Sequence, residues 1–483
     1  MRTHMSWLSE AEADLIVEQA LGLLERVGMC MAGSQGLPAL AAAGAAVDGA
    51  SGVVRFPAQM VLDAVAHAPR RVVMAGAAPE FDVVLDEGEP SHFCSSGCAA
   101  FTLDADTNER RPSTLADLRD ATALLDETPD VDLLWTTVTA NDVPIEVREL
   151  VGYYAVLGAS HKHVVFVDCP SQADPIERMI PILAGDEASF RARPRFSTLL
   201  TAASPLKADG ALLDFHSRVA AWGVPVKVYT VPMAGATSPV TLAGTITQGI
   251  AELLGVTVAL QTFAPGSRLI WGPSPTSMDP FSGGISYGSP EAALMGVACV
   301  KIAHRLGVPV SAPGMATDAK YAALQAGFEK GTKGLLTVAA EADILSGGVG
   351  LIDAANTLYL PQIVSDGEMA GVIRRLLAEV EVSTETIMAD MVERVGIGGT
   401  FLREKETTRR LRAGEHLRTR VFTRAGFDAW QAAGRDETAV AREVVAEMLA
   451  AHAEREPPLT PEQRRELAAV CEVTDDVERA LQR

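Results

Sequence analysis

The segments RFSTLLTAASP (residues 195–205) and PVKVYTVPMAG (residues 225–235) decide the fold class. Each is a short run rich in Val, Leu and Thr that ends in small or polar residues, and each is followed by a stretch with helical periodicity. Such a run predicts a buried β-strand followed by a helix, which is the unit from which parallel sheets are built.

The same unit recurs along most of the chain, at intervals that are mostly about 30 to 40 residues, the length of a βα unit. The other runs are VDLLWTTVTAND (131–142), HVVFVDCP (163–170), RLIWGPSPTS (268–277), PVSAPGMATD (309–318), ADILSGGVG (342–350) and LPQIVSDGE (360–368). This spacing predicts an α/β fold, a (β/α)8 TIM barrel over residues 111–370. We expect an N-terminal helical and α+β accessory region at 1–110 and a C-terminal helical region at 371–483. The last interval is short, so LPQIVSDGE fits the period least well.

The composition indicates a compact soluble protein. The chain has 483 residues, of which 48% are hydrophobic and 21% charged, with a net charge of −21. Nucleic acid and anionic membranes would repel such a chain, because binding to phosphate is dominated by its neutralisation with basic groups. The N-terminus lacks the apolar core of a signal peptide, and no run reaches the roughly 18 apolar residues of a membrane span. We expect a cytoplasmic homo-oligomer.

The six cysteines, at positions 30, 94, 98, 169, 299 and 471, are scattered through the chain, which favours reduced thiols over a disulfide framework. Cys94 and Cys98 could hold a metal together with His92. A C-x3-C motif without a second pair is weak evidence for zinc, so buried thiols are favoured and no metal is expected.

The stretch PGMATDAKYAALQAGFEK (313–330) follows the sixth predicted strand. Helical spacing would place Asp318, Gln325 and Glu329 on one face. One interpretation is a solvated helix whose carboxylates act as caps or pair with nearby lysines. The other is that this face lies at the barrel mouth, because barrel enzymes build their sites on the loops after the strands.

Long motifs occur in a characteristic order along the chain. They are GAAVDGASGVVRFPAQMVLDAVAHAPRRVVMAG (44–76), DADTNERRPSTLADLRDATALLDETPDVD (104–132), PMAGATSPVTLAGTITQGIAELLG (232–255), GSPEAALMG (288–296), TDAKYAALQAGFEK (317–330) and GIGGTFLREKETTRR (396–410). With these motifs the chain resembles the trimethylamine methyltransferase superfamily over nearly its whole length.

The resemblance implies a (β/α)8 barrel that presents a methylated amine to the Co(I) of a separate corrinoid protein. Members that act on trimethylamine carry a pyrrolysine, and no such residue occurs here. The chain therefore looks like the non-pyrrolysine branch, which implies a quaternary amine substrate such as glycine betaine. The nearest approach to a corrinoid-binding motif, DFHSRV (214–219), lacks the glycine. We therefore expect no tightly bound cofactor, the corrinoid (cobalamin) being supplied by the partner protein.

A quaternary ammonium substrate needs aromatic faces around its charge. The candidates for substrate binding are aromatic or polar residues near predicted strand ends. They are Trp271, Tyr287, Phe281, Tyr229, Phe166, Asn141 and His92. Packing of the barrel is the alternative for the aromatic residues. Asp142 could cap the next helix, and His161 is more typical of a structural histidine. Glu329, Gln325 and Asp318 are the candidate catalytic residues.

Two further segments leave alternatives open. Gly347, Gly348 and Gly350 in LSGGVG occupy the phosphate-binding position of such barrels, and they equally fit close backbone approach to a neighbouring element. The basic run 403–424 predicts either a solvated mixed-charge face or a docking surface for an acidic corrinoid carrier.

Lys227 on the fourth predicted strand supports a second hypothesis. Schiff-base lysines occur on barrel strands, so a lyase or aldolase is an alternative, although a buried lysine paired with a carboxylate is favoured. A third hypothesis is a protein that binds quaternary ammonium compounds without turnover.

Overall fold

A computed structural model describes residues 7–167 and 170–481. Its centre consists of parallel strands in two sheets, ordered β14-β12-β11-β10-β9 and β17-β18-β6. The strands are β6 (His92–Phe93), β9 (Leu133–Trp135), β10 (His163–Val167), β11 (Phe196–Ala202), β12 (Val226–Thr230), β14 (Leu269–Pro273), β17 (Ser311–Pro313) and β18 (Ile344–Ser346).

The two sheets meet at both edges through single parallel bridges. One bridge pairs Trp271 with Val310, and the other pairs Cys94 with Leu133. The Trp271 amide donates to the Pro309 carbonyl at 2.8 Å, and the Ser95 amide donates to the Leu133 carbonyl at 3.1 Å. The pairings thus follow a circuit through eight strands, which we call the strand ring. The α/β class expected from the sequence is confirmed.

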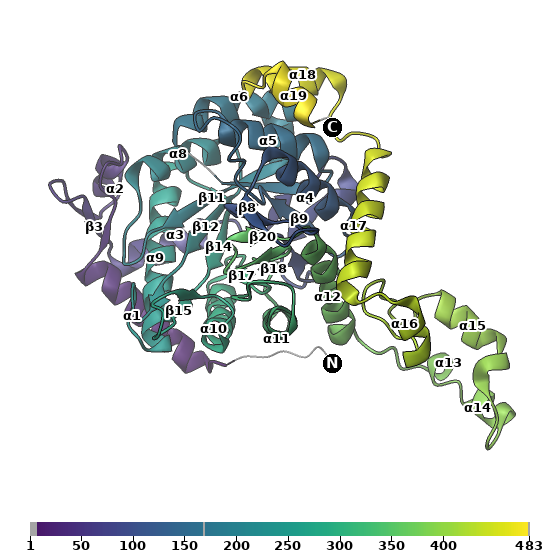
Figure 1. Cartoon of the computed structure of the whole chain (residues 1–483). Helices are drawn as coiled ribbons and strands as arrows, with labels where there is room; N and C mark the ends of the chain where they lie inside the picture. Colours follow the sequence, from purple (N-terminus) through teal and green to yellow (C-terminus); the bar gives the residue numbers. More distant parts are fainter. Residues whose placement is uncertain (1–6, 168–169, 482–483) are drawn as a thin grey trace.

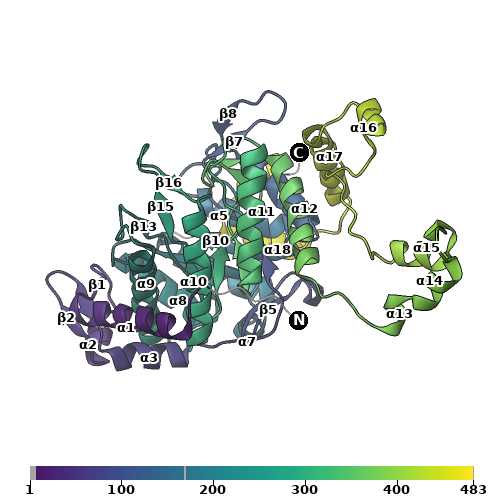
Figure 2. The ribbon, with the colours of Figure 1, turned by 90° about the horizontal axis from the view of Figure 1, so that it is seen from below.

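Each strand of the ring is followed by a helix, and Figures 1 and 2 show these helices outside the strands. They are α4 (Leu115–Glu127), α5 (Arg148–Ala159), α6 (Ala173–Ala184), α8 (Gly210–Ala221), α9 (Leu242–Phe263), α10 (Pro290–Leu306), α11 (Leu324–Ala339) and α12 (Leu360–Leu377). Helix α9 is long and apolar enough to cross a membrane by length and composition, but 78% of its apolar window is buried inside the molecule. Such extensive burial is typical of a helix in the core of a protein.

The prediction of a strand at 360–368 is wrong. LPQIVSDGE forms the beginning of α12, with Pro361 in the first turn, where proline is well tolerated. The eighth strand of the ring is instead β6, which lies ahead of residue 110 and pairs with β18. A strand of two residues is too short to leave a periodic signal in the sequence.

The amino ends of the ring are filled by part of the N-terminal region. The hairpin of β4 (Val72–Met74) and β5 (Val83–Leu85) places its apolar side chains among those of Leu133, Ile270 and Ile344. Helix α1 (Glu10–Arg26) packs against α9, next to a small sheet of β1 (Met29–Cys30), β2 (Ala46–Asp48) and β3 (Val53–Arg55) and helix α3 (Ala58–His67).

Side chains alternate along the long strands of the ring. Leu199, Lys227 and Ile270 are in register on three neighbouring strands. Leu199 and Ile270 belong to the interior cluster of the ring, whereas Leu200 and Val228 pack in the outer core beneath the helices. This two-residue period explains why the sequence runs are apolar throughout, since both faces of each strand are buried.

Loops after the strands add two small sheets. One consists of β13 (Met233–Ala234), β15 (Thr276–Met278) and β16 (Ile285–Ser286), from the loops that follow β12 and β14. The other consists of β7 (Phe101–Leu103), β8 (Arg110–Pro112), β19 (Leu351–Ile352) and β20 (Thr357–Leu358), from the loops that follow β6 and β18.

The C-terminal part divides into a packed portion and an arm. Helix α17 (Glu437–Ala453) packs against α4 and α12, and α18 (Pro461–Val470) packs against α6. Residues 379–416 form the arm, with α13 (Thr384–Ile387), α14 (Ala389–Val395), the short helix Phe401–Arg403 and α15 (Lys405–Arg412). Figures 1 and 2 show it projecting from the body, and none of these helices has a buried residue.

A fully buried ion pair joins α11 to α12. The Lys330 Nζ lies 2.6 Å from an Asp366 carboxylate oxygen, and both side chains have zero exposure. Lys330 also donates to the Gly348 carbonyl at 2.6 Å, and Asp366 accepts from the Gly350 amide at 2.8 Å. The pair therefore holds the loop after β18 as well as the two helices.

Replacing Lys330 with Met should lower the free energy of unfolding by about 3 to 5 kcal/mol, because the Asp366 charge stays buried without its partner. Lys320→Met is the matched control, since Lys320 pairs with Asp353 while 67% exposed and should cost less than about 1 kcal/mol. Urea unfolding of both variants checks this expectation. Equal losses would contradict it.

Candidate active site

The carboxyl half of the strand ring contains a polar cluster in otherwise apolar surroundings. Trp135 of β9, Lys227 and Tyr229 of β12, Ser346 of β18 and Cys94 after β6 contribute to it. Lys227 Nζ donates to the Ser346 hydroxyl at 3.2 Å and lies 4.5 Å from the Trp135 ring centroid and 5.5 Å from that of Tyr229. The lysine thus reaches from β12 to strands elsewhere in the ring.

Burial governs protonation in this cluster. It lowers the pKa of Lys227 to about 8, and the nearby Cys94 offsets only part of that effect. It raises the pKa of the Cys94 thiol to about 12, although Lys227 and Trp135 oppose the rise. At neutral pH the cluster therefore holds a largely protonated lysine beside a neutral thiol.

Within residues 7–167 and 170–481, the structure shows no carboxylate paired with Lys227, in contrast to the pairing favoured from the sequence. Its hydrogen bond goes to a hydroxyl group, and its other close neighbours are aromatic faces. A glycine makes room for this arrangement. A Cβ atom at Gly272 of β14 would lie 2.9 Å from Lys227 Cε and 2.8 Å from Tyr229 Cδ2.

A strap of three residues, Ser286 to Gly288, runs from the end of β16 toward α10 and carries Tyr287. Asp318 holds this strap, because its carboxylate accepts from the Tyr287 amide at 2.9 Å, the Gly288 amide at 3.0 Å and the Ser286 hydroxyl at 2.7 Å. Asp318 precedes α11 and does not belong to it. The Asp318 carboxylate therefore accepts its hydrogen bonds from groups of the protein itself.

Glu329 and Gln325 of α11 hold the loop that carries Asp318, and through Asp318 they hold the strap. Glu329 accepts from the Thr317 hydroxyl at 2.5 Å, the Asp318 amide at 2.9 Å and Gln325 Nε2 at 2.8 Å. The buried Lys333 donates to the Tyr287 carbonyl at 2.6 Å, and burial lowers the pKa of Lys333 to about 8 despite the neighbouring carboxylates of Asp318 and Glu329. The three predicted catalytic residues are thus brought together, in a network that positions Tyr287.

Tyr229 and Tyr287 lie close together where the ring opens toward its carboxyl side. Burial raises the pKa of Tyr287, and the neighbouring Tyr229 and Asp318 raise it further. Thr201, in register with Tyr229, is exposed, and both tyrosines are half-buried. Solvent therefore reaches the layer of side chains directly above Lys227.

Two other predicted aromatic residues face away from the interior. Trp271 is fully buried in the outer core, where its indole N–H donates to the Thr257 hydroxyl of α9 at 3.0 Å. Phe166 is stacked between Tyr153 and Phe196 in the outer core. Both placements contradict a role in a substrate cage, and the reason is strand alternation, which turns these side chains outward.

The remaining predicted residues are dispersed. Phe281 is 98% exposed at the tip of the β15–β16 hairpin. Asn141 donates to the carbonyls of Ala100, Ser113 and Thr139, which is a structural role. His92 begins β6, at the amino end of the ring, and lies 3.8 Å from Asp132. These three residues lie apart from the polar cluster.

Other residues considered in the sequence have structural partners. Asp142 caps α4 by accepting from the Leu115 amide at 2.8 Å, and His161 lies 2.8 Å from an Asp126 oxygen. Cys98 is exposed, in contrast to the buried Cys94. Asp168 and Cys169, at the end of the second predicted strand, lie outside the described residues.

The glycine loop after β18 is packed against its neighbours. Gly347, Gly348 and Gly350 have φ angles of 86°, 100° and 77°, which favour glycine. A Cβ at Gly348 would lie 1.9 Å from the Met315 carbonyl oxygen, and one at Gly350 would lie 2.4 Å from Ile363 Cγ1. Close backbone approach accounts for these glycines, and their role toward a cofactor or partner stays a prediction.

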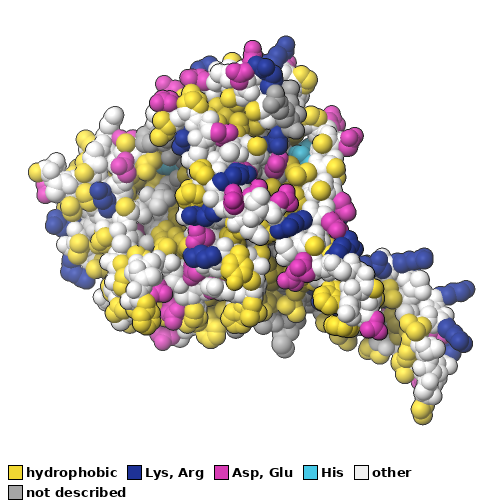
Figure 3. Space-filling view, in the orientation of Figure 1, with side chains coloured by type: hydrophobic (Ala, Val, Ile, Leu, Met, Phe, Trp, Pro, Cys, Tyr) yellow, Lys and Arg dark blue, Asp and Glu magenta, His cyan; other side chains and the backbone are white. Residues whose placement is uncertain are grey.

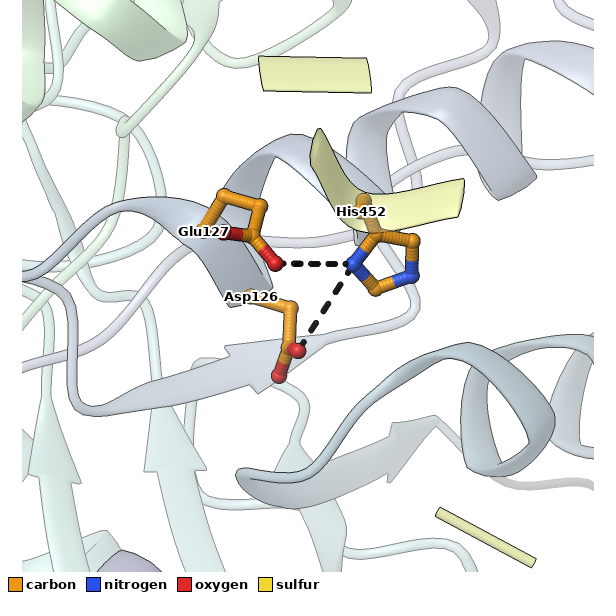
Figure 4. A group of neighbouring side chains, drawn as sticks. All are labelled: Asp126, Glu127 and His452. Atoms are coloured by element: carbon orange, nitrogen blue, oxygen red, sulfur yellow. Dashed lines mark hydrogen bonds and ion pairs between the residues drawn. The ribbon is translucent and has the colours of Figure 1, made fainter. Parts of the chain in front are cut away.

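Asp126, Glu127 and His452 have ligand atoms close enough to hold a metal ion (Figure 4). The carboxylates already have cationic partners, since Arg455 Nη1 lies 3.0 Å from Asp126 and 2.8 Å from Glu127. Burial raises the pKa of Asp126. Hydrogen bonds from His161 and the positive charge of the nearby Lys162 outweigh this effect, so that the pKa of Asp126 lies below its ordinary value. The group therefore serves to attach α17 to α4.

A cavity of about 830 Å³ lies at the amino ends of the strands. Its lining includes Ser91 before β6, His304 in the last turn of α10 and Asp343 before β18. It lies at the opposite end of the ring from Tyr287, and in parallel α/β folds the carboxyl end is where catalytic groups gather. We therefore place the candidate site at the carboxyl end.

Trp135, Ser346 and the interior position of Cys94 were not predicted from the sequence as parts of the candidate site. Trp135 had a usable signal, because it lies two residues after the inward-facing Leu133 and so shares its face. Ser346 had no such signal in the sequence, because the register of β18 depends on its pairing with β6.

The comparisons with known proteins agree on one family. The family model described as trimethylamine methyltransferase (MTTB) matches residues 1–474. The trimethylamine methyltransferase MttB of Methanosarcina thermophila is 30% identical over 417 residues, covering 85% of each chain. The glycine betaine methyltransferase of Desulfitobacterium hafniense (strain Y51) is 27% identical over 425 residues, covering 88% of each chain.

A solved structure supports the fold. The monomethylamine methyltransferase MtmB of Methanosarcina barkeri aligns with a TM-score of 0.54 at 12% sequence identity, covering 93% of this chain and 89% of that one. At this identity the similarity concerns the fold alone.

Lys227→Met should raise the free energy of unfolding at pH 7 by roughly 1 to 3 kcal/mol, because folding no longer buries an ammonium. The folded-state pKa of Lys227, about 8, lies below the unfolded value of about 10.4. Wild-type stability therefore rises with pH through this window, and the advantage of the variant shrinks from pH 8 to pH 10.

Urea unfolding of both proteins at pH 7, 8, 9 and 10 measures this difference. Cys94 and Tyr229, the titratable groups beside Lys227, are present in both proteins, so the comparison at each pH removes their own contributions. A variant less stable than wild type at pH 7 would show that Lys227 is not a costly buried charge.

Proposed function

The chain belongs to the trimethylamine methyltransferase family, and on that premise we propose that it transfers a methyl group from a quaternary amine to the Co(I) of a separate corrinoid protein. Betaines such as glycine betaine are the proposed substrates, in keeping with the glycine betaine methyltransferase among its relatives. Its relatives are methyltransferases, and this chain is one as well.

The proposed reaction suits a site with few charged groups. The methyl carbon moves from nitrogen to cobalt, which the partner supplies, and the electron pair of the broken C–N bond stays on nitrogen. A quaternary nitrogen thus leaves as a neutral tertiary amine and needs no proton. The work left to this chain is to bind the cation, orient one methyl group outward and exclude water.

The observation that carries the proposal is the pair of half-buried tyrosines, Tyr229 and Tyr287, at the carboxyl end of the ring. Aromatic faces attract a quaternary ammonium by roughly 0.5 to 2 kcal/mol each when water is excluded. Asp318, Glu329 and Lys333 fix the strap that carries Tyr287, so this face is held ready before the ligand arrives.

We further propose that the strand ring is a closed (β/α)8 barrel with its mouth at the carboxyl ends, and that the protein works in the cytoplasm. Apolar side chains surround the mouth. Phe281 is 98% exposed. Tyr321, in the loop before α11, is 66% exposed, and Leu324 and Phe328 at the beginning of α11 are 88% and 68% exposed. Such a surface suits a transient partner that brings cobalt to the opening.

The arm suggests a contact between copies of this chain. Ile397 is fully exposed, and Leu402 is 85% exposed, at positions with no body side chain to cover them among the described residues. The run 403–424 contains eight Lys or Arg residues and three Glu residues, in a chain whose net charge is −21. Figure 3 shows dark blue basic side chains along the outer arm. The acidic body of a second copy complements this charge, so we propose a homo-oligomer in which the arm contacts a neighbour.

The wild-type protein, mixed with a Co(I) corrinoid protein and glycine betaine, should produce methyl-cobalt absorbance. Tyr287→Leu should weaken glycine betaine binding by about 2- to 30-fold, with little effect on 3,3-dimethylbutanoate, in which carbon replaces the nitrogen. Tyr321→Leu, an exposed tyrosine nearby, is the control. Calorimetric titrations measure the affinity of each variant for both ligands. Equal losses of affinity for glycine betaine and 3,3-dimethylbutanoate would refute the aromatic contact.

A double variant, Ile397→Asp with Leu402→Asp, should have a smaller mass than wild type by light scattering, because charges replace the apolar contacts of the arm. Ile145→Asp, an exposed residue of the body, is the control. A wild-type monomer would refute the contact between copies. An unchanged mass with weaker methyl transfer to the corrinoid protein would assign the arm to that partner instead.

A further inference from the structure

Lys227 differs from the other buried lysines in how its charge is compensated. Lys330 contacts a carboxylate and a carbonyl, Lys162 donates to two carbonyls at 2.7 Å each, and Lys333 donates to one carbonyl. Lys227 is 3% exposed, and it donates a hydrogen bond to the neutral hydroxyl of Ser346 at 3.2 Å. Among the described residues, it alone of the four has neither a carboxylate nor a carbonyl as hydrogen-bond acceptor.

An ammonium group has three donors, and burying one without a negative partner is costly. A methionine or leucine at position 227 would remove the free-energy cost of burying a charge. The arrangement nevertheless accommodates the lysine, since Gly272 leaves the space that the lysine stem and the Tyr229 ring occupy. The charge therefore calls for a compensating group that the described part of the chain does not supply.

A ligand that enters from the carboxyl side would meet Lys227 at the end of its path. Tyr229 and Thr201 form the partly exposed layer, and Lys227 lies two residues earlier on β12, one layer deeper. The aromatic faces are thus nearer the opening, and the ammonium is nearer the centre of the ring. This order fits a molecule with a cationic end outward and an anionic end inward.

We propose that Lys227 binds the anionic group of the substrate, so that the site selects zwitterionic quaternary amines that carry a carboxylate. The inference rests on the proposed function and extends it. With the carboxylate on Lys227, the methylated nitrogen lies toward Tyr229 and Tyr287, where a partner can reach its methyl groups. A simple cation such as choline would meet an unpaired ammonium of the same sign.

The lysine also affects the aromatic faces. Its ammonium lies over the rings of Trp135 and Tyr229, so a cationic ligand competes with it for those faces. A carboxylate that draws the ammonium toward itself relieves this competition, but choline has no such group. Removing the charge of Lys227 should therefore change the two kinds of ligand in opposite directions.

The test is a set of calorimetric titrations at pH 7 with glycine betaine, choline and 3,3-dimethylbutanoate. Lys227→Met should weaken binding of the two carboxylates at least tenfold and leave choline unchanged or more tightly bound. Lys162→Met is the matched control, because Lys162 is buried with a pKa of about 8 but lies before β10, outside the polar cluster. It should not alter the preference between ligands.

Equal losses for all three ligands, no loss for glycine betaine, or a wild type that does not bind glycine betaine would each overturn the inference. Unfolding curves show whether each variant is folded. A methyl-cobalt assay on the wild type separates the two claims. Selective loss of carboxylate binding in Lys227→Met without wild-type methyl transfer would refute the proposed function and keep the assignment of Lys227.

Discussion

A ring of eight parallel strands must fill its own interior, and the way this chain does so determines where chemistry can occur. The amino half is filled by apolar side chains from the β4–β5 hairpin, including Val72 and Leu85. The carboxyl half is filled by Trp135, Lys227 and Tyr229, which combine large volume with polar groups. The interior is therefore inert at one end and polar at the other.

The strap that carries Tyr287, at the polar end, is held by a chain of hydrogen bonds. Glu329 accepts from the Asp318 amide, and the Asp318 carboxylate accepts from the Tyr287 amide. Gly288 makes this approach possible, because a Cβ there would lie 2.2 Å from a Glu329 oxygen. One half-buried tyrosine is thus positioned by the carboxylates of Asp318 and Glu329.

The sequence predicts the repeat of strand and helix well, since seven of the eight predicted runs contain strands of the ring. It fails for β6, whose two residues leave no pattern, and for Trp271, whose outward direction depends on strand register. The division at residues 110 and 370 stays a prediction. For the candidate site, the sequence predicts Tyr229, Tyr287 and Asp318 but not how they lie relative to one another, which depends on contacts between β12, the strap and the loop before α11.

Lys227 shows how physical cost can point to a function that the sequence pattern does not specify. The sequence favours a buried lysine on this strand, but it does not show which groups surround the ammonium. Its position among Trp135, Tyr229 and Ser346, together with a glycine opposite, makes it a charge that the fold tolerates at a penalty. Penalties of this kind are typical of binding and catalytic sites, where the ligand supplies what the fold leaves unpaired. A zwitterionic substrate would complete this interior electrostatically, and a plain cation would not.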